Sequence, residues 1–139
     1  MPSLEIVLRL ALAAGLGAAL GLEREWRQKP AGLRTNILIA LGAALFTILS
    51  LRLGTDTGRI AAQVVTGIGF LGAGAILRSG QSVHGMTTAA TIWVNAAIGM
   101  AAGAGEFEMA TVATVVTLLV LVVLPPIEGF FERRNRRLS

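Results

Sequence analysis

One dense cluster of charged side chains in this 139-residue chain lies between residues 23 and 36. Two acids, Glu23 and Glu25, stand there among four basic residues: Arg24, Arg27, Lys29 and Arg34. These two carboxylates could hold a hydrated cation. The neighbouring cations would compete for these acids, so we favour an internal salt-bridge network that docks the segment. Thr35 or Asn36 is predicted to cap the next helix through a side-chain oxygen.

A second set of polar side chains recurs at helical spacing in two later segments. One carries a stripe of polar and small residues at three- or four-residue steps: His84, Thr88, Thr91, Asn95, Gly99 and Gly103. In the other, Asp56 precedes a similar stripe: Arg59, Gln63, Thr66 and Gly67. Polar groups within a membrane span are functional candidates by default. Two interpretations stay open, namely hydrogen-bonded glue between two helices, or a polar path or ligand cleft.

Glycines are dense in one segment, where Gly67, Gly69, Gly72 and Gly74 fall within eight residues. The run fits the GxGxxG pattern, but a dinucleotide site needs a preceding strand and a βαβ unit. Because the run lies inside an apolar stretch, we predict that the four glycines pack helices closely. We expect this helix at the centre of a bundle, crowded on several sides or locally broken. Small residues four apart predict further packing pairs: Ala14 with Ala18, Gly17 with Gly21, Ala97 with Ala101, and Gly99 with Gly103.

The sequence offers little for catalysis. It has one histidine and no cysteine, whereas enzymatic chemistry needs a nucleophile, a base and an orienting group within reach of one another. We therefore predict that the chain is not an enzyme.

The composition indicates what must position these residues. Hydrophobic types make up 54% of the chain and charged types 14%, against about 25% charged in a typical soluble domain. Five apolar segments approach the length of about 20 residues that a membrane-spanning helix needs: 4–22, 37–53, 60–77, 86–104 and 109–127. We predict an all-α integral membrane bundle of about five transmembrane helices. We predict that Pro125-Pro126 ends the fifth helix. Residues 1–127 would form one domain, and residues 128–139 a basic cytoplasmic tail.

The basic residues predict the orientation. One side of the membrane would receive nine of them: Arg24, Arg27, Lys29, Arg34, Arg78, Arg133, Arg134, Arg136 and Arg137. The other side would receive Arg52 and Arg59. Because cytoplasmic loops carry the excess of Lys and Arg, the N-terminus should lie outside and the C-terminus inside. We expect the tail to contact anionic lipid and not nucleic acid, and Glu5 and Arg9 to pair within the first helix.

Three ordered motifs resemble the MgtC/SapB family of membrane proteins. The first is Gly21-Leu-Glu-Arg-Glu-Trp-Arg followed by Ala31-Gly-Leu-Arg-Thr-Asn, the second runs from residue 59 to 74, and the third from 85 to 99. The resemblance implies a multi-pass protein of the bacterial inner membrane that serves acclimation to magnesium limitation and survival inside host cells. It also implies Mg²⁺ as the ion to consider and the F-type ATP synthase as one membrane partner. Longer members carry a soluble C-terminal domain, which we expect this short form to lack.

Two main functions follow as hypotheses. The leading one is binding of other membrane proteins, or self-association, in magnesium stress. The alternative is an oligomeric magnesium channel or transporter with a polar path along the third and fourth helices; a purely structural packing module is a third. The candidate interaction or ion-site residues are Glu23, Arg24, Glu25, Arg34, Thr35, Asn36, Asp56, Arg59, Gln63, Thr88, Thr91 and Asn95.

Overall fold

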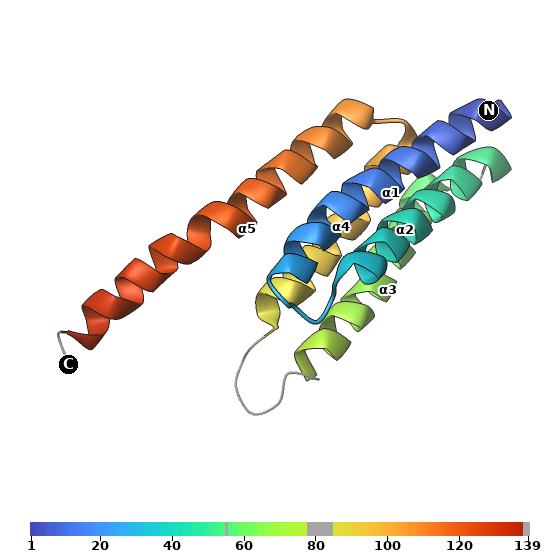
Figure 1. The fold of residues 1–139 in the computed structure, drawn as a ribbon. Helices are drawn as coiled ribbons and strands as arrows, with labels where there is room; N and C mark the ends of the chain where they lie inside the picture. The colour runs from blue at the N-terminus through green and yellow to red at the C-terminus, as the bar shows by residue number, and fades with distance from the viewer. Residues whose placement is uncertain (55, 78–84, 138–139) are drawn as a thin grey trace.

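A computed structural model describes residues 1–54, 56–77 and 85–137, which form five helices (Figure 1). They are α1 (Ser3–Trp26), α2 (Leu33–Leu53), α3 (Thr57–Leu77), α4 (Met86–Ala104) and α5 (Phe107–Arg136). The predicted all-α class and the five helices are confirmed. Arg78 and His84 lie outside the described residues.

Three of the helices are followed within two residues by a residue in the left-handed region of backbone space. Gly54 after α2 has φ +62° and Gly105 after α4 has φ +87°, and glycine adopts this region without a steric penalty. The turn after α1 uses Gln28 instead, with φ +54°. There the N–H groups of Gln28 and Lys29 donate to the carbonyls of Glu25 and Arg24, each at 3.0 Å. These caps let the chain reverse sharply between helices.

The centre of the bundle is α4, which contacts each of the other four helices. The prediction that the glycine-rich helix α3 would be central was wrong. Within the described residues, only Gly72 of its four predicted packing glycines has a neighbour, because a Cβ atom there would lie 3.6 Å from Ala89. A Cβ atom at Gly67, Gly69 or Gly74 would meet nothing described within 4 Å. Glycine permits close approach, but it does not determine which helix approaches.

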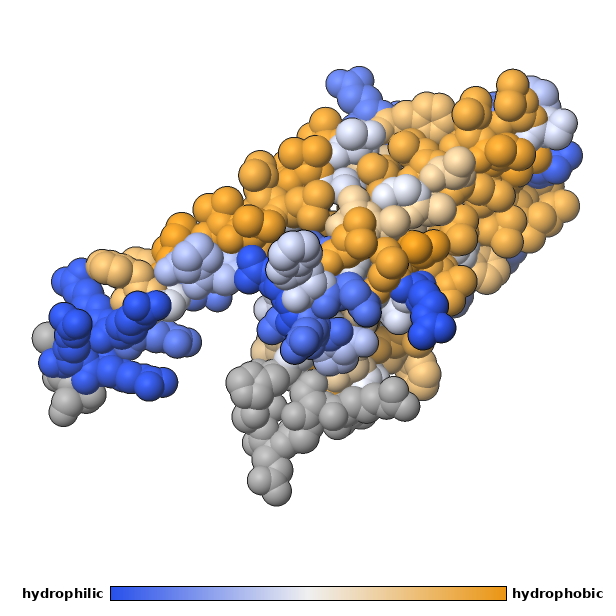
Figure 2. All heavy atoms as spheres, in the orientation of Figure 1, coloured by the Kyte–Doolittle hydropathy of each residue, from blue (hydrophilic) through white to orange (hydrophobic). Residues whose placement is uncertain are grey.

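The outer surface of the bundle is apolar. In the described part of the chain, four helices are long and apolar enough to cross a membrane: α1, α2, α3 and α5. Helix α4 is not among these four, and it packs against each of them. Figure 2 shows hydrophobic side chains over the middle of the molecule and hydrophilic ones toward its ends. This banding is what a bilayer requires of the surface that faces it.

The last helix corrects one prediction. α5 continues through Pro125 and Pro126 to Arg136, so the prolines do not end it. Each proline removes one N–H donor, but its φ of about −65° is compatible with a helix. In Figure 1 the C-terminal half of α5 diverges from the other helices. The basic segment after residue 127 is therefore mostly helical.

Candidate functional site

Two buried asparagines join α2 to α4. The side chains of Asn36 and Asn95 are both 0% exposed. Asn95 Nδ2 donates to the backbone oxygen of Asn36 at 2.8 Å and to its Oδ1 at 3.1 Å. Asn36 Nδ2 in turn donates to the carbonyls of Ala31 at 3.0 Å and Gly32 at 2.9 Å. The pair thus links the turn after α1, the start of α2 and the middle of α4.

Small residues continue this contact along both helices. One turn beyond the asparagines, a Cβ atom at Gly99 would clash with the backbone of Ala40. One turn further, a Cβ atom at Gly103 would lie 2.5 Å from the carbonyl oxygen of Ala44. We call this contact the α2–α4 seam, formed by Asn36, Ala40, Ala44, Asn95, Gly99 and Gly103. It confirms Gly99 and Gly103 as a packing pair on α4, whereas Ala97 of the other predicted pair is exposed.

Helix α1 covers the same residues from another side. A Cβ atom at Gly17 would lie 2.8 Å from both Ala40 Cβ and the carbonyl oxygen of Asn36. At Gly21 it would lie 2.8 Å from Leu33 Cα. The predicted packing pair of Gly17 and Gly21 is therefore also confirmed, and Asn36 is enclosed by two helices.

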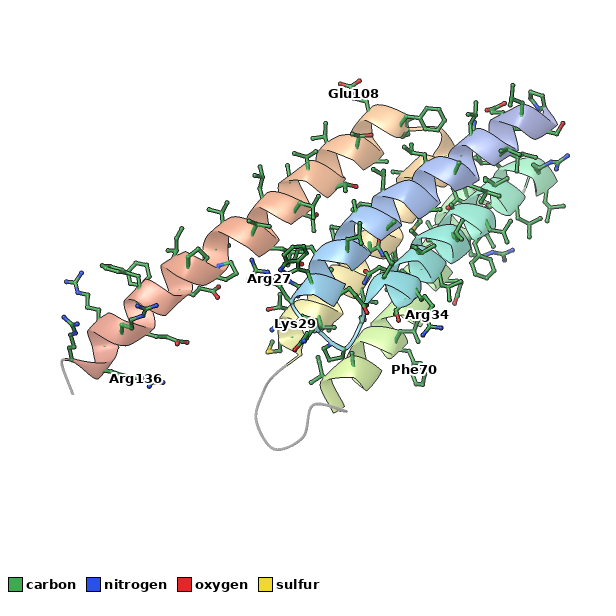
Figure 3. All side chains as sticks on the ribbon, viewed as in Figure 1. Arg27, Lys29, Arg34, Phe70, Glu108 and Arg136 are labelled. Atoms are coloured by element: carbon green, nitrogen blue, oxygen red, sulfur yellow. The ribbon has the colours of Figure 1, made fainter. Side chains whose placement is uncertain are left out.

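The predicted salt-bridge network forms around Glu23. Arg24 Nε donates to Glu23 Oε2 at 2.6 Å, and Arg27 Nε lies 2.6 Å from Glu23 Oε1 as an ion pair. Arg24 is only 3% exposed, and its Nη1 has no hydrogen-bond partner among the described residues. Lys29 and Arg34 are exposed and project from the same end of the bundle (Figure 3). The two arginines occupy the Glu23 carboxylate, which is 9% exposed and so gives a metal ion little access.

The second acid of this segment has a structural role that the sequence did not suggest. Glu25 Oε2 accepts the backbone N–H of Leu33 at 2.9 Å and so caps α2. The absence of a side chain at Gly32 leaves room for this carboxylate. The predicted cap from Thr35 or Asn36 was wrong, because α2 begins at Leu33 and not at residue 37.

The two polar stripes do not combine into one path. On α4, Thr88 and Thr91 are 2% and 4% exposed, and Thr91 Oγ1 donates to the carbonyl of Thr87 at 2.8 Å. On α3, Arg59 and Gln63 are exposed. The innermost polar residue of α4 is bonded to α2, and not to α3.

Asp56 lies at the start of α3. Its Oδ1 accepts the backbone N–H groups of Gly58 at 3.0 Å and Arg59 at 3.3 Å. The carboxylate thereby satisfies donors that the first turn of a helix leaves unpaired. A capping role accounts for one of its two oxygens.

Arg9, which the sequence predicts only as the partner of Glu5, also joins α1 to the end of α4. Glu5 and Arg9 form the predicted ion pair. Arg9 Nη1 also donates to the carbonyl of Gly103 at 2.7 Å, at the C-terminal end of α4. A cation is favourable there, since the last carbonyls of a helix are unpaired and carry partial negative charge. No local pattern shows which helix end a distant arginine will meet.

A wide apolar groove of about 980 Å³ lies between α2 and α3. Its walls include Phe46 of α2 and Gln63, Gly67, Phe70 and Gly74 of α3. Metal ligands are scarce: over residues 1–54, 56–77 and 85–137, no three acids or histidines gather closely enough to hold an ion. The described part of the chain therefore offers no preformed cage for Mg²⁺.

These features define a multi-pass α-helical protein of the membrane, in which buried polar side chains join helices to one another. A family model described as the MgtC family matches residues 10–130. The chain belongs to the MgtC family, and like its bacterial relatives it is a multi-pass protein of the inner membrane.

Three relatives illustrate the similarity. Protein MgtC of Salmonella typhimurium LT2 is 52% identical over 119 residues, which are 85% of this chain and 52% of that protein. The Escherichia coli K12 protein named "Putative magnesium transporter YhiD" is 52% identical over 145 aligned positions, covering 97% of this chain and 67% of YhiD. A protein of Synechocystis is 47% identical over 132 residues. The chain spans about half the length of MgtC, and no solved structure matches it.

Proposed function

We propose that this protein serves magnesium homeostasis in the inner membrane by binding other membrane proteins or further copies of itself, and not by conducting the ion. Membership of the MgtC family and the name of its Escherichia coli relative support the connection to magnesium. The resemblance in sequence implies the F-type ATP synthase as one partner. Catalysis has no part in this proposal.

The observation that carries the proposal is the closure of the α2–α4 seam. A path for Mg²⁺ needs oxygen ligands or water along its length, because the ion gives up its waters reluctantly. Asn36 and Asn95 are both 0% exposed and bonded to each other. The carboxylate of Glu23 is paired with arginines, and that of Glu25 caps α2. In contrast, the α2–α3 groove and most of α5 are open to a partner.

The test uses purified protein in liposomes that contain a magnesium-sensitive dye. We expect the rate of Mg²⁺ entry to equal that of protein-free liposomes. In parallel, a strain without the gene should grow poorly in low magnesium and recover when this chain is expressed. Recovery of growth without flux supports binding, whereas rapid flux overturns the proposal.

One observation favours the alternative, an oligomeric magnesium channel or transporter. Asn95 Oδ1 is buried and has no donor among the described residues, so an oxygen is available inside the bundle. Under this alternative, Asn95→Ala or Asp56→Ala would abolish a flux that the unaltered protein shows. Equal, background rates of Mg²⁺ entry with the unaltered protein and with both variants would exclude this alternative.

A further inference from the structure

Helix α3 is the least covered of the spanning helices. Only 6% of its apolar stretch is buried, against 39% for α2. Gly72 faces the bundle through Ala89, so the opposite side of α3 points outward. In Figure 3, Phe70 projects away from the other helices, and it is 81% exposed. One side of α3 is therefore free to contact another molecule.

This free side has a regular composition. At about 100° per residue, five residues fall within one narrow sector of α3: Arg59, Gln63, Gly67, Phe70 and Gly74. Asp56, which caps the helix, directly precedes it. We call these residues together the α3 face. Four of them line the α2–α3 groove. Gly67 and Gly74 leave open space on either side of the Phe70 ring, since an added Cβ atom there would meet nothing described within 4 Å.

Gln63 shows that lipid alone is a poor occupant of the groove. It lies about 9 Å along α3 from its first residue, at 1.5 Å per residue, and so inside the apolar stretch. Its side chain is exposed and makes no hydrogen bond with another described residue. Acyl chains cannot bond an amide, whereas a second amide at the same depth can both donate and accept. An identical chain inserted in the same orientation supplies that amide.

The end of the α3 face is complementary to itself in charge. Asp56 and Arg59 lie three residues apart, both are exposed, and neither makes an ion pair within the described ranges. Around a two-fold axis, Arg59 of one copy meets Asp56 of the other, and the reverse. Opposite charges so placed favour the symmetric pair over contact with an unrelated apolar helix.

We propose that the α3 face binds the α3 face of a second copy of this chain, with the two-fold axis along the membrane normal. The inference names the partner for the binding role proposed above and rests on that role for its meaning in the cell. Gln63 pairs with its counterpart, Phe70 packs into the open space at Gly67 and Gly74, and the acid and base at the end of each α3 form two reciprocal ion pairs.

Because the chain has no cysteine, single cysteines can report this contact in native membranes. Under a mild oxidant, Gly67→Cys and Gly74→Cys should form disulfide-linked dimers. Gly69→Cys is the matched control: it also has open space, but it lies about 120° around the helix from the α3 face. We expect at least tenfold less dimer from it. Equal yields at all three positions, or none at Gly67→Cys and Gly74→Cys, would overturn the proposal.

Two differently tagged copies then test the polar contacts by co-purification. Gln63→Leu should lower recovery about three- to twentyfold, the range for one interhelical side-chain bond in a membrane. Thr66→Val is the control, because that hydroxyl already bonds to the carbonyl of Ala62. Copies with Arg59→Asp should bind copies with Asp56→Arg better than either binds itself; the opposite order contradicts the reciprocal pairs. If the two tagged copies do not co-purify and liposomes still admit no Mg²⁺, the α3 contact is wrong while the proposed function stands. The two experiments therefore test the two proposals separately.

Discussion

At the scale of single residues, Asn95 makes the clearest energetic prediction. Asn95→Ala removes the donor that serves both oxygens of Asn36 in a site closed to water. Leaving buried acceptors unpaired costs about 1–3 kcal/mol, so we expect the free energy of unfolding in mixed micelles to fall by that amount. Thr66→Ala is the control, since its hydroxyl is exposed and bonds within its own helix. If the two variants unfold alike, the α2–α4 seam does not depend on the amide pair.

Gln28 is a second residue with a measurable effect, in the opposite direction. Its φ of +54° lies in the left-handed region, which costs a residue with a Cβ atom about 1–2 kcal/mol. Gln28→Gly should remove this cost. Part of the gain is offset, because glycine raises the conformational entropy of the unfolded chain. We expect a net stabilisation of about 0.5–1 kcal/mol in the same unfolding assay. Gln28→Ala keeps the Cβ atom and should bring no gain; a gain from both would point to another cause.

At the scale of elements, the contact between α1 and α2 requires a glycine at position 17 and does not require one at position 15. Gly17→Ala places a methyl group 2.8 Å from the carbonyl oxygen of Asn36, and backbone cannot yield as a side chain does. Overpacking of this kind costs about 1–3 kcal/mol. Gly15→Ala, two residues away on the same helix, meets nothing described within 4 Å. It should leave stability unchanged or raise it by up to about 1 kcal/mol, and equal losses would contradict the packing described here.

The elements also show how far the sequence leads. Apolar stretches of spanning length predict the five helices, and small residues four apart predict the contacts of α1 and α4. The start of α2 could not be predicted locally, because Glu25 of the preceding helix caps it at Leu33. The glycines of α3 were assigned to the centre because their number is visible in the sequence, whereas the element they approach is not.

The candidate site was predictable in its members and not in its connections. Asn36 and Asn95 were both candidates, but 59 positions separate them in the sequence. The spacing within α4 predicts a polar stripe and cannot say which helix it faces. Pairing that stripe with α3 led to the hypothesis of a polar path, and in the folded chain Asn95 bonds to α2 instead. Contacts between distant segments depend on how helices pack, which no local pattern contains.

At the scale of the whole molecule, the orientation in the membrane gives the last prediction. Lys29 and Glu108 are both exposed and lie at opposite ends of the bundle (Figure 3). The end that carries Lys29 also carries Arg27, Arg34 and Arg136, and an excess of Lys and Arg favours the cytoplasmic side. In the cysteine-free chain, an impermeant maleimide added to spheroplasts should label Glu108→Cys and spare Lys29→Cys. Opening the membrane with detergent should make Lys29→Cys react as well, which shows that its thiol is accessible.

The reverse labelling pattern would place the N-terminus inside, and similar labelling of both variants in sealed spheroplasts would mean that the chain inserts in two orientations. Because a parallel pair of α3 helices needs both copies inserted the same way, a mixed result would also remove the common depth at which the two Gln63 amides meet.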